Sequence, residues 1–509
     1  INKGNTKMSF SFLNTVMTWV LKKRIHQIEL FMKYPLEVQD EVLTTLLKSA
    51  VNTEFGKKHD FKSIKNYEGF SRKVPITNYE EFFKLIDRSI KGEQNVFWNN
   101  PIKWYAQSSG TTNSVSKFIP VSNECLEDCH FKAGKDVLCL YINNNVNSNL
   151  FSGKSLRLGG SKKLYENNNY YFGDLSAILI DNLPIWAEMI STPNNEISLM
   201  EKWDEKIDAI VQSTLNENVT SLAGVPSWML TLLNSILENS KKININEVWE
   251  NLEVYFHGGV NFNPYRNEFK KILSDDVKFY ETYNASEGFF AIQDRNDSSE
   301  LLLMLDYGIY YEFIESKYYG KLNQKIINLS QVKKNINYVM VISTNSGLWR
   351  YVIGDTIRFS STFPFRIRIT GRIKNFINAF GEELIIENAE NALEKTLKDH
   401  NSSIIDYTAA PFFMGESSSG YHEWLIEFKN FPKNLKQFTI DLDNNIQKIN
   451  SDYKSKRFKN ITMSQLIIKT GRKGLFYDWL KKKKKLGGQN KVPRLCNNRD
   501  LIEELLEIN

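Results

Sequence analysis

The sequence has few cysteines, a small net charge and no internal repeats, and each of these limits the classes of protein to which it can belong. It has four cysteines in 509 residues, too few for a disulfide framework, and this usage favours a reducing, cytoplasmic compartment. Its formal net charge of +6 is small for the length, so charge gives no sign of a nucleic-acid binder, although it suits a protein that handles anions. With 41% hydrophobic residues and no internal repeats, the chain has the composition of a globular protein of two or three domains.

No apolar run in the sequence is long enough to cross a membrane. The best candidate covers residues 10–21, which is shorter than a membrane span, and Lys22, Lys23 and Arg24 follow it where a secretory signal would need a small-residue cleavage site. We therefore expect a surface helix, within a mostly helical region that reaches to about residue 100. Residues 1–7, before Met8, are expected to be a vector remnant.

Two predicted strands run directly into short motifs. Residues 252–256 lead into His257-Gly258-Gly259-Val260, and residues 277–280 lead into the stretch 281–288. Helical patterns such as residues 201–212 alternate with these strands, which favours an α/β fold with parallel strand pairs. In such sheets ligands bind beyond the carboxyl ends of the strands, where both motifs would lie.

The second half of the chain is predicted to change character near residue 370. Before that point, residues 301–315 are expected to form a hairpin that turns at Asp306-Tyr307-Gly308, and residues 338–344 and 349–359 a second strand pair. After it come a helix over 385–398, strands over 404–413 and 421–429, and a helix from 435 to about 453.

The predicted fold class is therefore α/β with two domains. Residues 8–370 would form a large N-terminal domain with mixed sheets and flanking helices. Residues 371–509 would form a small α+β C-terminal domain.

The loop Ser108-Ser109-Gly110-Thr111-Thr112, followed by Lys117, has the chemistry of a phosphate-binding loop. Small residues expose backbone N–H groups, hydroxyls donate hydrogen bonds, and the lysine adds a positive charge, so the stretch suits a polyphosphate. It is not a Walker A loop, because no second glycine precedes a Lys-Ser or Lys-Thr pair. The alternative is a polar surface turn.

Cys125, Cys129 and His130 also lie close together in the sequence. Two cysteines and one histidine do not complete a zinc set. Because the two cysteines are one helical turn apart, we expect them on a packed helix face rather than at a metal.

Six short motifs follow one another in a fixed order, and together they carry a resemblance. Through them the chain resembles the auxin-responsive acyl-acid-amido-synthetase family of the acyl-adenylating superfamily, which also includes acyl-CoA synthetases and luciferases. The likeness covers roughly residues 105–495. The motifs are residues 108–117, 257–260, 283–287, Tyr351-Val352-Ile353-Gly354-Asp355, Gly371-Arg372 and Gly487-Gly488-Gln489-Asn490-Lys491-Val492-Pro493-Arg494.

The resemblance, with the chemistry of each motif, implies a site for ATP and Mg²⁺. Two glycines would let the adenine lie flat on the backbone, an aromatic ring would stack on it, and a carboxylate would accept hydrogen bonds from the ribose hydroxyls. The predicted nucleotide-binding residues are Ser108, Ser109, Gly110, Thr111, Thr112 and Lys117 at the β- and γ-phosphates, Gly258, Gly259 and Val260 at the adenine, Tyr283 stacked on it, Ala285 and Ser286 nearby, Asp355 at the ribose, and Arg372 at the domain junction.

Two residues are predicted to take part in the chemistry. Glu287 would ligate Mg²⁺ through oxygen, as that metal prefers. Lys491 resembles the lysine that a mobile small domain brings to the α-phosphate in this superfamily. The stretch 375–383 does not closely match the plant enzymes. A simpler role stays open for three of the predicted site residues. Glu287 could be an exposed loop carboxylate, Asp355 a turn residue and Lys491 a surface lysine.

The resemblance implies a ligase that activates a carboxylic acid with ATP and joins it to an amino acid amine. An acyl-CoA ligase with the same first step, or a nucleotide-binding protein without turnover, is the alternative. We expect small carboxylic acid and amino acid partners, no nucleic acid and no membrane span. Trp228 and Phe289 could line an acyl pocket, but core packing is the simpler role.

Overall fold

The structure is a computed structural model. It describes residues 23–108, 117–159, 165–167, 170–259, 262–373, 376–377, 379–380, 382, 384–412, 420–457, 463–483, 485–486 and 491–509. The predicted helix over residues 10–21 therefore lies outside the described part. Among the described residues, no helix is long and apolar enough to span a membrane.

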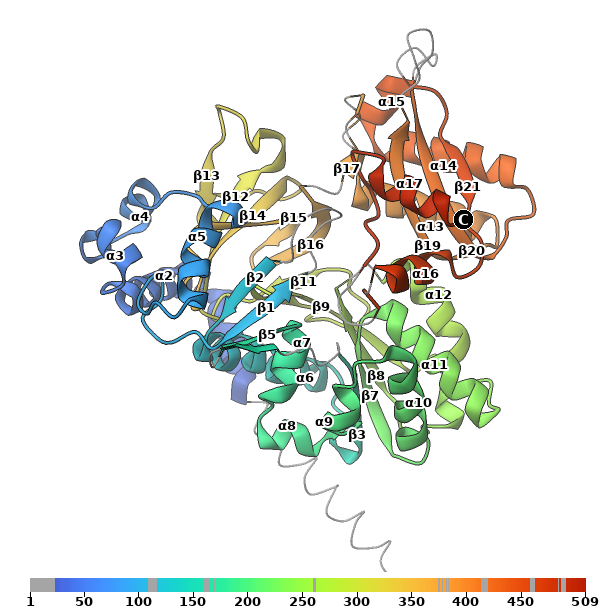
Figure 1. The fold of residues 1–509 in the computed structure, drawn as a ribbon, viewed down its shortest axis with the longest axis horizontal. Coiled ribbons are helices and arrows are strands. Elements are labelled where there is room, and N and C mark those ends of the chain that lie inside the picture. Colours follow the sequence, from blue (N-terminus) through green and yellow to red (C-terminus); the bar gives the residue numbers. More distant parts are fainter. Residues whose placement is uncertain are drawn as a thin grey trace, which may run out of the picture.

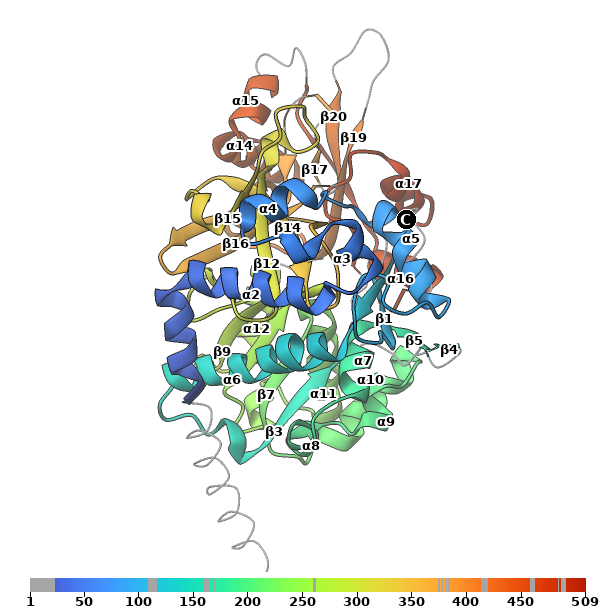
Figure 2. The same cartoon turned by 90° about the vertical axis from the view of Figure 1, so that its left-hand side faces the viewer.

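A layer of helices opens the described chain and covers one face of the molecule (Figure 2). The longest of them begins with Pro35 at its first turn and buries Leu43, Leu46 and Leu47. Its buried Gln39 donates to the carbonyls of Leu305 and Ile309, which fixes the helix to the sheet beneath. The elements of this layer are α2 (Pro35–Ala50), α3 (Glu54–Lys58), η1 (Phe61–Ser63), α4 (Tyr67–Lys73) and α5 (Tyr79–Ile90).

The largest sheet has twelve strands among the described residues, in the order β13-β12-β14-β15-β16-β11-β10-β9-β8-β7-β3-β6. The half from β6 to β9 is parallel, and the rest is antiparallel. Its strands are β3 (Lys154–Leu158), β6 (Ser191–Thr192), β7 (Val219–Gly224), β8 (Val254–Gly258), β9 (Lys278–Ala285), β10 (Gly288–Ile292), β11 (Leu301–Leu303), β12 (Ile309–Glu315), β13 (Ile326–Asn328), β14 (Asn337–Thr344), β15 (Tyr351–Thr362) and β16 (Phe365–Arg372).

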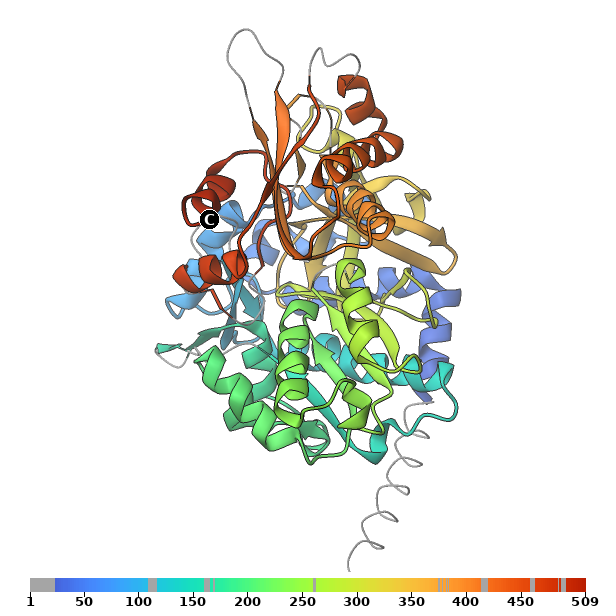
Figure 3. The same cartoon turned by 90° about the vertical axis from the view of Figure 1, so that its right-hand side faces the viewer.

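Helices cover both faces of the parallel half, as its apolar strands require. Helices α10, α11 and α12 lie on one face, in front of the sheet in Figure 3, and α6 lies on the other (Figure 1). The helical elements between residues 125 and 331, of which η5 and η6 belong to the antiparallel part, are η2 (Cys125–Phe131), α6 (Lys132–Asn144), η3 (Leu150–Ser152), α7 (Leu175–Asp181), α8 (Ile185–Met189), α9 (Asn195–Ser198), α10 (Trp203–Thr214), α11 (Pro226–Ser240), η4 (Ile245–Glu247), α12 (Asn263–Ile272), η5 (Ser316–Tyr318) and η6 (Leu329–Gln331).

A second sheet contains the two strands on either side of the predicted phosphate-binding loop, residues 108–117, which we call the hydroxyl loop. Its order is β2-β1-β5-β4, formed by β1 (Trp104–Ser108), β2 (Lys117–Val121), β4 (Tyr165–Asn167) and β5 (Tyr170–Gly173). Strands β1 and β2 are antiparallel, and Ser108 pairs with Lys117. The loop is therefore the connection of a hairpin whose two ends are fixed by strand pairing.

The predicted hairpin over residues 301–315 is wrong. Strand β11 pairs with β10 and β16, whereas β12 pairs with β13 and β14. Strands β14, β15 and β16 lie between β12 and β11, and the residue at the expected turn, Asp306, forms ion pairs with Arg24 and Lys132. The second predicted pair is confirmed, because β14 and β15 are antiparallel neighbours.

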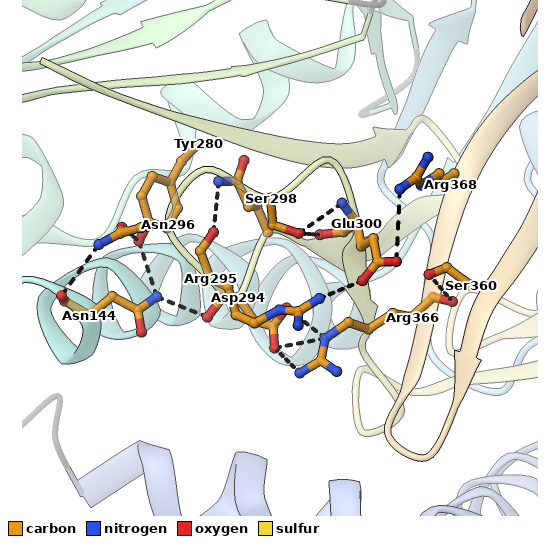
Figure 4. A network of polar contacts seen from close by, with 11 residues as sticks. Asn144, Tyr280, Asp294, Arg295, Asn296, Ser298, Glu300, Ser360, Arg366 and Arg368 are labelled. Atoms are coloured by element: carbon orange, nitrogen blue, oxygen red, sulfur yellow. Dashed lines mark hydrogen bonds and ion pairs between the residues drawn. The ribbon is translucent and has the colours of Figure 1, made fainter. Parts of the chain in front are cut away.

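A network of charged side chains ties the connection after β10 to β16 (Figure 4). Arg366 on β16 donates from Nε to Asp294 Oδ1 at 3.0 Å and from Nη2 to Oδ2 at 2.6 Å. Glu300 pairs with Arg295 and Arg368 in the same network. These bonds hold β16 against β10 and β11. The candidate site described below includes Arg372 at the end of β16 and Glu287 in the turn that precedes β10.

The C-terminal part has its own sheet and core (Figure 1). The predicted helix and both strands after residue 385 are confirmed. The long helix is broken at Asn450, whose side chain accepts from Tyr453 N at 2.7 Å and caps a new helix. The elements are β17 (Phe376–Ile377), β18 (Leu384–Ile385), α13 (Ile386–Asp399), β19 (Ser403–Phe412), β20 (Tyr421–Asn430), α14 (Leu435–Ile449), α15 (Ser451–Arg457), β21 (Ile467–Thr470), α16 (Leu475–Lys482) and α17 (Asp500–Glu507).

Polar and apolar contacts join this part to the large sheet's helices. Arg494 Nη2 donates to the Tyr265 hydroxyl at 3.0 Å, and Lys429 forms an ion pair with Glu268. Phe476 belongs to one buried apolar cluster with residues of α10, α11 and α12. The two parts are thus packed together in this arrangement.

Candidate active site

Asp355 is the most firmly held carboxylate of the candidate site. It lies on β15 opposite Arg372 at the end of β16. Arg372 Nε donates to its Oδ1 at 2.6 Å, and the Tyr283 hydroxyl donates to its Oδ2 at 2.7 Å. Gly354 before it has a φ of +89°, a backbone region that glycine adopts without strain, and its carbonyl accepts from Ile373 N at 2.8 Å. Three predicted site residues are therefore brought together, with the carboxylate fixed from both sides.

Glu287 lies in the turn between β9 and β10, next to this group. The residue is buried, and burial raises the pKa of its carboxyl above the usual range. The positive charges of Arg372 and Lys117 act in the opposite direction, while Asp355 adds to the rise. The structure thus places Glu287 in the electrostatic field of three other predicted site residues.

The turn that holds Glu287 also contains Ala285 and Ser286. Ala285 ends β9 and is half-buried, and Ser286 is buried. Tyr283 is buried too, with its ring 4.9 Å from that of Phe290. Its hydroxyl points to Asp355, so its described contacts orient the carboxylate, and stacking on an adenine stays a prediction.

The glycines at the end of β8 are needed for a close approach of chain segments. A Cβ at Gly258 would lie 2.6 Å from the carbonyl oxygen of Thr282, far inside van der Waals contact. Gly259 has a φ of +82°, and a Cβ there would lie 3.2 Å from Lys491 Nζ. Glycine is therefore required at 258 by the close approach of Thr282 and is favoured at 259 by the positive φ. Val260 lies outside the described residues.

Lys491 reaches this strand end from the C-terminal part. The residue is exposed, but desolvation of its ammonium group, together with the positive charge of Arg372, lowers the pKa to about 8, while Asp355 opposes the shift. Val492 and the ion pair of Arg494 with Asp406 anchor the segment that carries it. The structure therefore brings Lys491 together with Asp355, Arg372 and Gly259.

Lys117 marks the base of the hydroxyl loop. Its ammonium lies 4.9 Å from the centre of the Tyr79 ring, and Phe118 N donates to the Tyr79 hydroxyl at 2.8 Å. Ser108 ends β1 opposite it. Ser109, Gly110, Thr111 and Thr112, and Gly487 to Asn490 of the last motif, lie outside the described residues.

Two residues near the site were not predicted as parts of it. Tyr79 supports Lys117 across 38 positions of sequence, and no pattern in the chain indicates that contact. His257 stacks on Phe262 with ring centres 4.0 Å apart, and burial lowers its pKa to about 3, so it is a neutral packing residue next to the glycines. Trp228 packs against Trp203, with ring centres 4.5 Å apart, in the core.

With this geometry in place, comparison with known proteins identifies the family. Family models match along most of the chain: the GH3 family N-terminal domain over residues 24–278, the central domain over 302–372 and the C-terminal domain over 387–500. The chain belongs to the GH3 family. This confirms the resemblance drawn from the motifs.

Plant members of the family are similar over most of their length. The indole-3-acetic acid-amido synthetase GH3.2 of Arabidopsis thaliana is 23% identical over 76% of this chain and 83% of its own length. The 4-substituted benzoates-glutamate ligase GH3.12 of the same plant is 22% identical over 92% of this chain and 94% of its own.

Solved structures share the fold of this GH3 protein. The GH3.15 acyl acid amido synthetase has a TM-score of 0.79 at 18% identity, and covers 96% of each chain. The 2-hydroxyisobutyryl-CoA ligase has a TM-score of 0.60 at 13% identity, over 92% of this chain and 91% of its own. The predicted fold class, a large α/β domain followed by a smaller C-terminal one, is confirmed.

Proposed function

We propose that this GH3 protein uses ATP to activate a small carboxylic acid as an acyl-adenylate and then joins the acyl group to the amine of an amino acid. The observation that carries the proposal is the convergence of Lys117, Glu287, Asp355, Arg372 and Lys491. They come from β2, the turn after β9, the β15–β16 pair and the C-terminal segment. The plant relatives named above support the same reaction class, since their names describe the coupling of carboxylic acids to amino acids.

The charge pattern suits a nucleotide triphosphate with a divalent cation. Three cationic groups, on Lys117, Arg372 and Lys491, surround two carboxylates, on Glu287 and Asp355. The cations would offset the phosphates, and Mg²⁺ would favour the ionised form of the buried Glu287 carboxyl. Mg²⁺ bound there would neutralise phosphate charge as the pyrophosphate leaves. The Glu287 carboxylate fits that ligand role because it is buried and acceptor-only when ionised.

Asp355 would bind the ribose hydroxyls. Arg372 and Tyr283 each donate one hydrogen bond to its carboxylate, which leaves further lone pairs for the two ribose hydroxyls. The loop from Ser108 to Thr112 would bind the β- and γ-phosphates, and Gly258 to Val260 would lie against the adenine. These roles follow from motif chemistry and from the position of the described residues.

The chemistry proceeds in two steps. In the first, a carboxylate oxygen of the acid attacks the α-phosphorus of ATP, the bond to the pyrophosphate oxygen breaks, and pyrophosphate leaves. Lys491 would donate to the α-phosphate oxygens, where negative charge develops. In the second step the neutral amine attacks the acyl carbon, AMP leaves with the electron pair of the broken C–O bond, and the amine loses a proton.

A panel assay tests the whole proposal. Pyrophosphate release is measured with a range of carboxylic acids, each alone, with amino acids and with coenzyme A, and products are identified by mass spectrometry. An N-acyl amino acid is the expected product. If a thioester is the only product, the protein is an acyl-CoA ligase. If no acid in the panel causes pyrophosphate release, the protein binds the nucleotide without turnover.

The same proposal includes a domain movement and a location in the cell. The segment after Arg372 would move as a unit between the two steps and carry Lys491 with it. The protein would act in the cytoplasm, in keeping with four buried cysteines that form no disulfide. Limited proteolysis with and without ATP tests the first statement, and imaging of the tagged chain tests the second.

A further inference from the structure

Cys125, Cys129 and His130 form a compact buried cluster outside the proposed nucleotide site. Their possible ligand atoms, two sulfurs and a ring nitrogen, all lie within 4.8 Å of one another. The residues are exposed by 1%, 0% and 5%. Three such groups in a protein interior have the donor chemistry of a metal site, with soft thiolates and an imidazole.

The backbone explains how the third residue joins the other two. In an α-helix, five residues turn the chain through about 500°, so residues 125 and 130 would point about 140° apart. The stretch η2 is a π-helix over Cys125–Phe131, in which i→i+5 hydrogen bonds stack residue 130 above residue 125. The expectation of an ordinary packed face placed the two cysteines one α-helical turn apart and counted His130 as too few additional ligands for zinc. The π-helical turn adds the histidine to their side of the helix.

His130 has no other hydrogen-bond partner to explain its burial. Within the described part of the chain, neither Nδ1 nor Nε2 finds one. A buried imidazole without partners is unfavourable, because both nitrogens have lost their hydrogen bonds to water. A metal bound to one of the nitrogens would remove half of this deficit.

A hydrogen-bond donor also reaches one of the sulfurs. Phe289 N donates to Cys129 Sγ at 3.2 Å. A donor of this kind stabilises a metal-bound thiolate and orients it. The backbone after the turn therefore provides one contact that suits a negatively charged Cys129 sulfur.

We propose that Cys125, Cys129 and His130 bind one zinc ion. Two thiolates and a neutral imidazole balance the charge of Zn²⁺, so the occupied site would be neutral and compatible with burial. Zinc–ligand bonds of about 2.0–2.3 Å require the donor atoms to move together by roughly 1 Å, within reach of side-chain rotation. The fourth position of a tetrahedral zinc would be taken by a water.

The position of the cluster links it to the turn that carries Glu287. A Cβ at Gly288, the next residue, would lie 3.7 Å from Cys129 Sγ, and the hydrogen bond from Phe289 N holds the following one. A zinc ion would therefore fix the inner side of this turn. The zinc site itself depends only on the cluster and does not rest on the proposed function.

Metal analysis of the full-length chain tests the site. The protein is purified without a metal-affinity step, and zinc is measured by mass spectrometry. We expect about one zinc per chain, less than a tenth of that in Cys129→Ser and in His130→Asn, and the full content in Cys139→Ser. Cys139 is the matched control, because it is also a buried cysteine outside any disulfide, on the adjoining helix α6, but it lies outside the cluster.

A second measurement on the unmutated chain removes any doubt about misfolded variants. After zinc is removed with a chelator, Co²⁺ is added, and thiolate-to-cobalt charge-transfer absorption is expected to rise to an end point of one ion per chain. The absence of zinc and of that absorption would overturn the proposal. So would equal zinc loss in Cys139→Ser, or a Cys125–Cys129 disulfide in the purified chain.

Discussion

Replacement of Lys491 by alanine is the sharpest test of the proposed site. Its ammonium lies within 3.2 Å of where a Gly259 Cβ would be, and it is electrostatically coupled to Arg372 and Asp355. If it donates to the α-phosphate as charge develops, its loss removes one preorganised donor. Such a loss costs about 2.7–4 kcal/mol in the transition state, or roughly 10²–10³ in rate. ATP affinity should change much less, since Lys491 comes from the part that is proposed to move.

The two half-reactions are assayed separately to locate the effect. Adenylation is followed by exchange of labelled pyrophosphate into ATP, and transfer by single-turnover reaction of a preformed adenylate with the amine. Lys482→Ala is the matched control, because Lys482 is an exposed lysine at the end of α16. If Lys491→Ala slows transfer as much as adenylation, the residue has been given the wrong role.

The pH profile gives an independent check on the same lysine. With its pKa lowered to about 8, the Lys491 ammonium is charged at lower pH and loses its charge as pH rises through that value. The kcat/KM for ATP reports on the free enzyme, so it should fall above about pH 8. Arginine stays charged throughout, and Lys491→Arg should lack this decline even if its maximal rate is lower. An identical decline in Lys491→Arg would assign the titration to another group.

Three further predictions follow from described contacts. Asp355→Ala should weaken ATP binding by about 1.5–3 kcal/mol for each lost hydrogen bond, or roughly 10- to 150-fold for one, whereas unchanged affinity by calorimetry would rule out the ribose role. Glu287→Gln should raise the Mg²⁺ concentration for half-maximal pyrophosphate exchange by roughly 10–100-fold, and an unaltered Mg²⁺ dependence would exclude it as a ligand. Arg350→Met leaves Glu312, its buried partner at 2.7 Å, uncompensated and should lower the free energy of unfolding in urea by about 3–5 kcal/mol. Arg350→Met combined with Glu312→Leu should recover most of this loss.

The motifs of the candidate site could be located from the sequence, because each is a short run of adjacent residues. A buried strand followed by glycines located Gly258, and the motif from Tyr351 to Asp355, together with the family resemblance, located Asp355. The pairing of β14 with β15 was also predicted, and it joins two apolar strands that are adjacent in the chain. Local patterns of this kind need no knowledge of distant contacts.

Contacts between distant segments could not be predicted in the same way. Residues 301–315 have the pattern of a hairpin, yet the ion pairs of Asp306 with Arg24 and Lys132 help direct the chain elsewhere. The support of Lys117 by Tyr79 and the π-helical register of residues 125–131 also depend on tertiary packing. In each case the deciding energy comes from partners far along the chain, which single-sequence patterns do not contain.

The distribution of the site over the two parts of the chain has a mechanistic consequence. Tyr283, Asp355 and Arg372 belong to neighbouring regions of one sheet and hold one another through hydrogen bonds of 2.6 and 2.7 Å. Lys491 shares no strand with them. Movement of the C-terminal part could therefore withdraw the lysine and leave the ribose-binding group intact. The contacts that such a movement would break include the hydrogen bond of Arg494 to Tyr265 and the packing of Phe476 against α10, α11 and α12, and the ribose-binding group takes part in neither. The adenylate could thus stay bound while the lysine leaves, as a two-step reaction on one site requires.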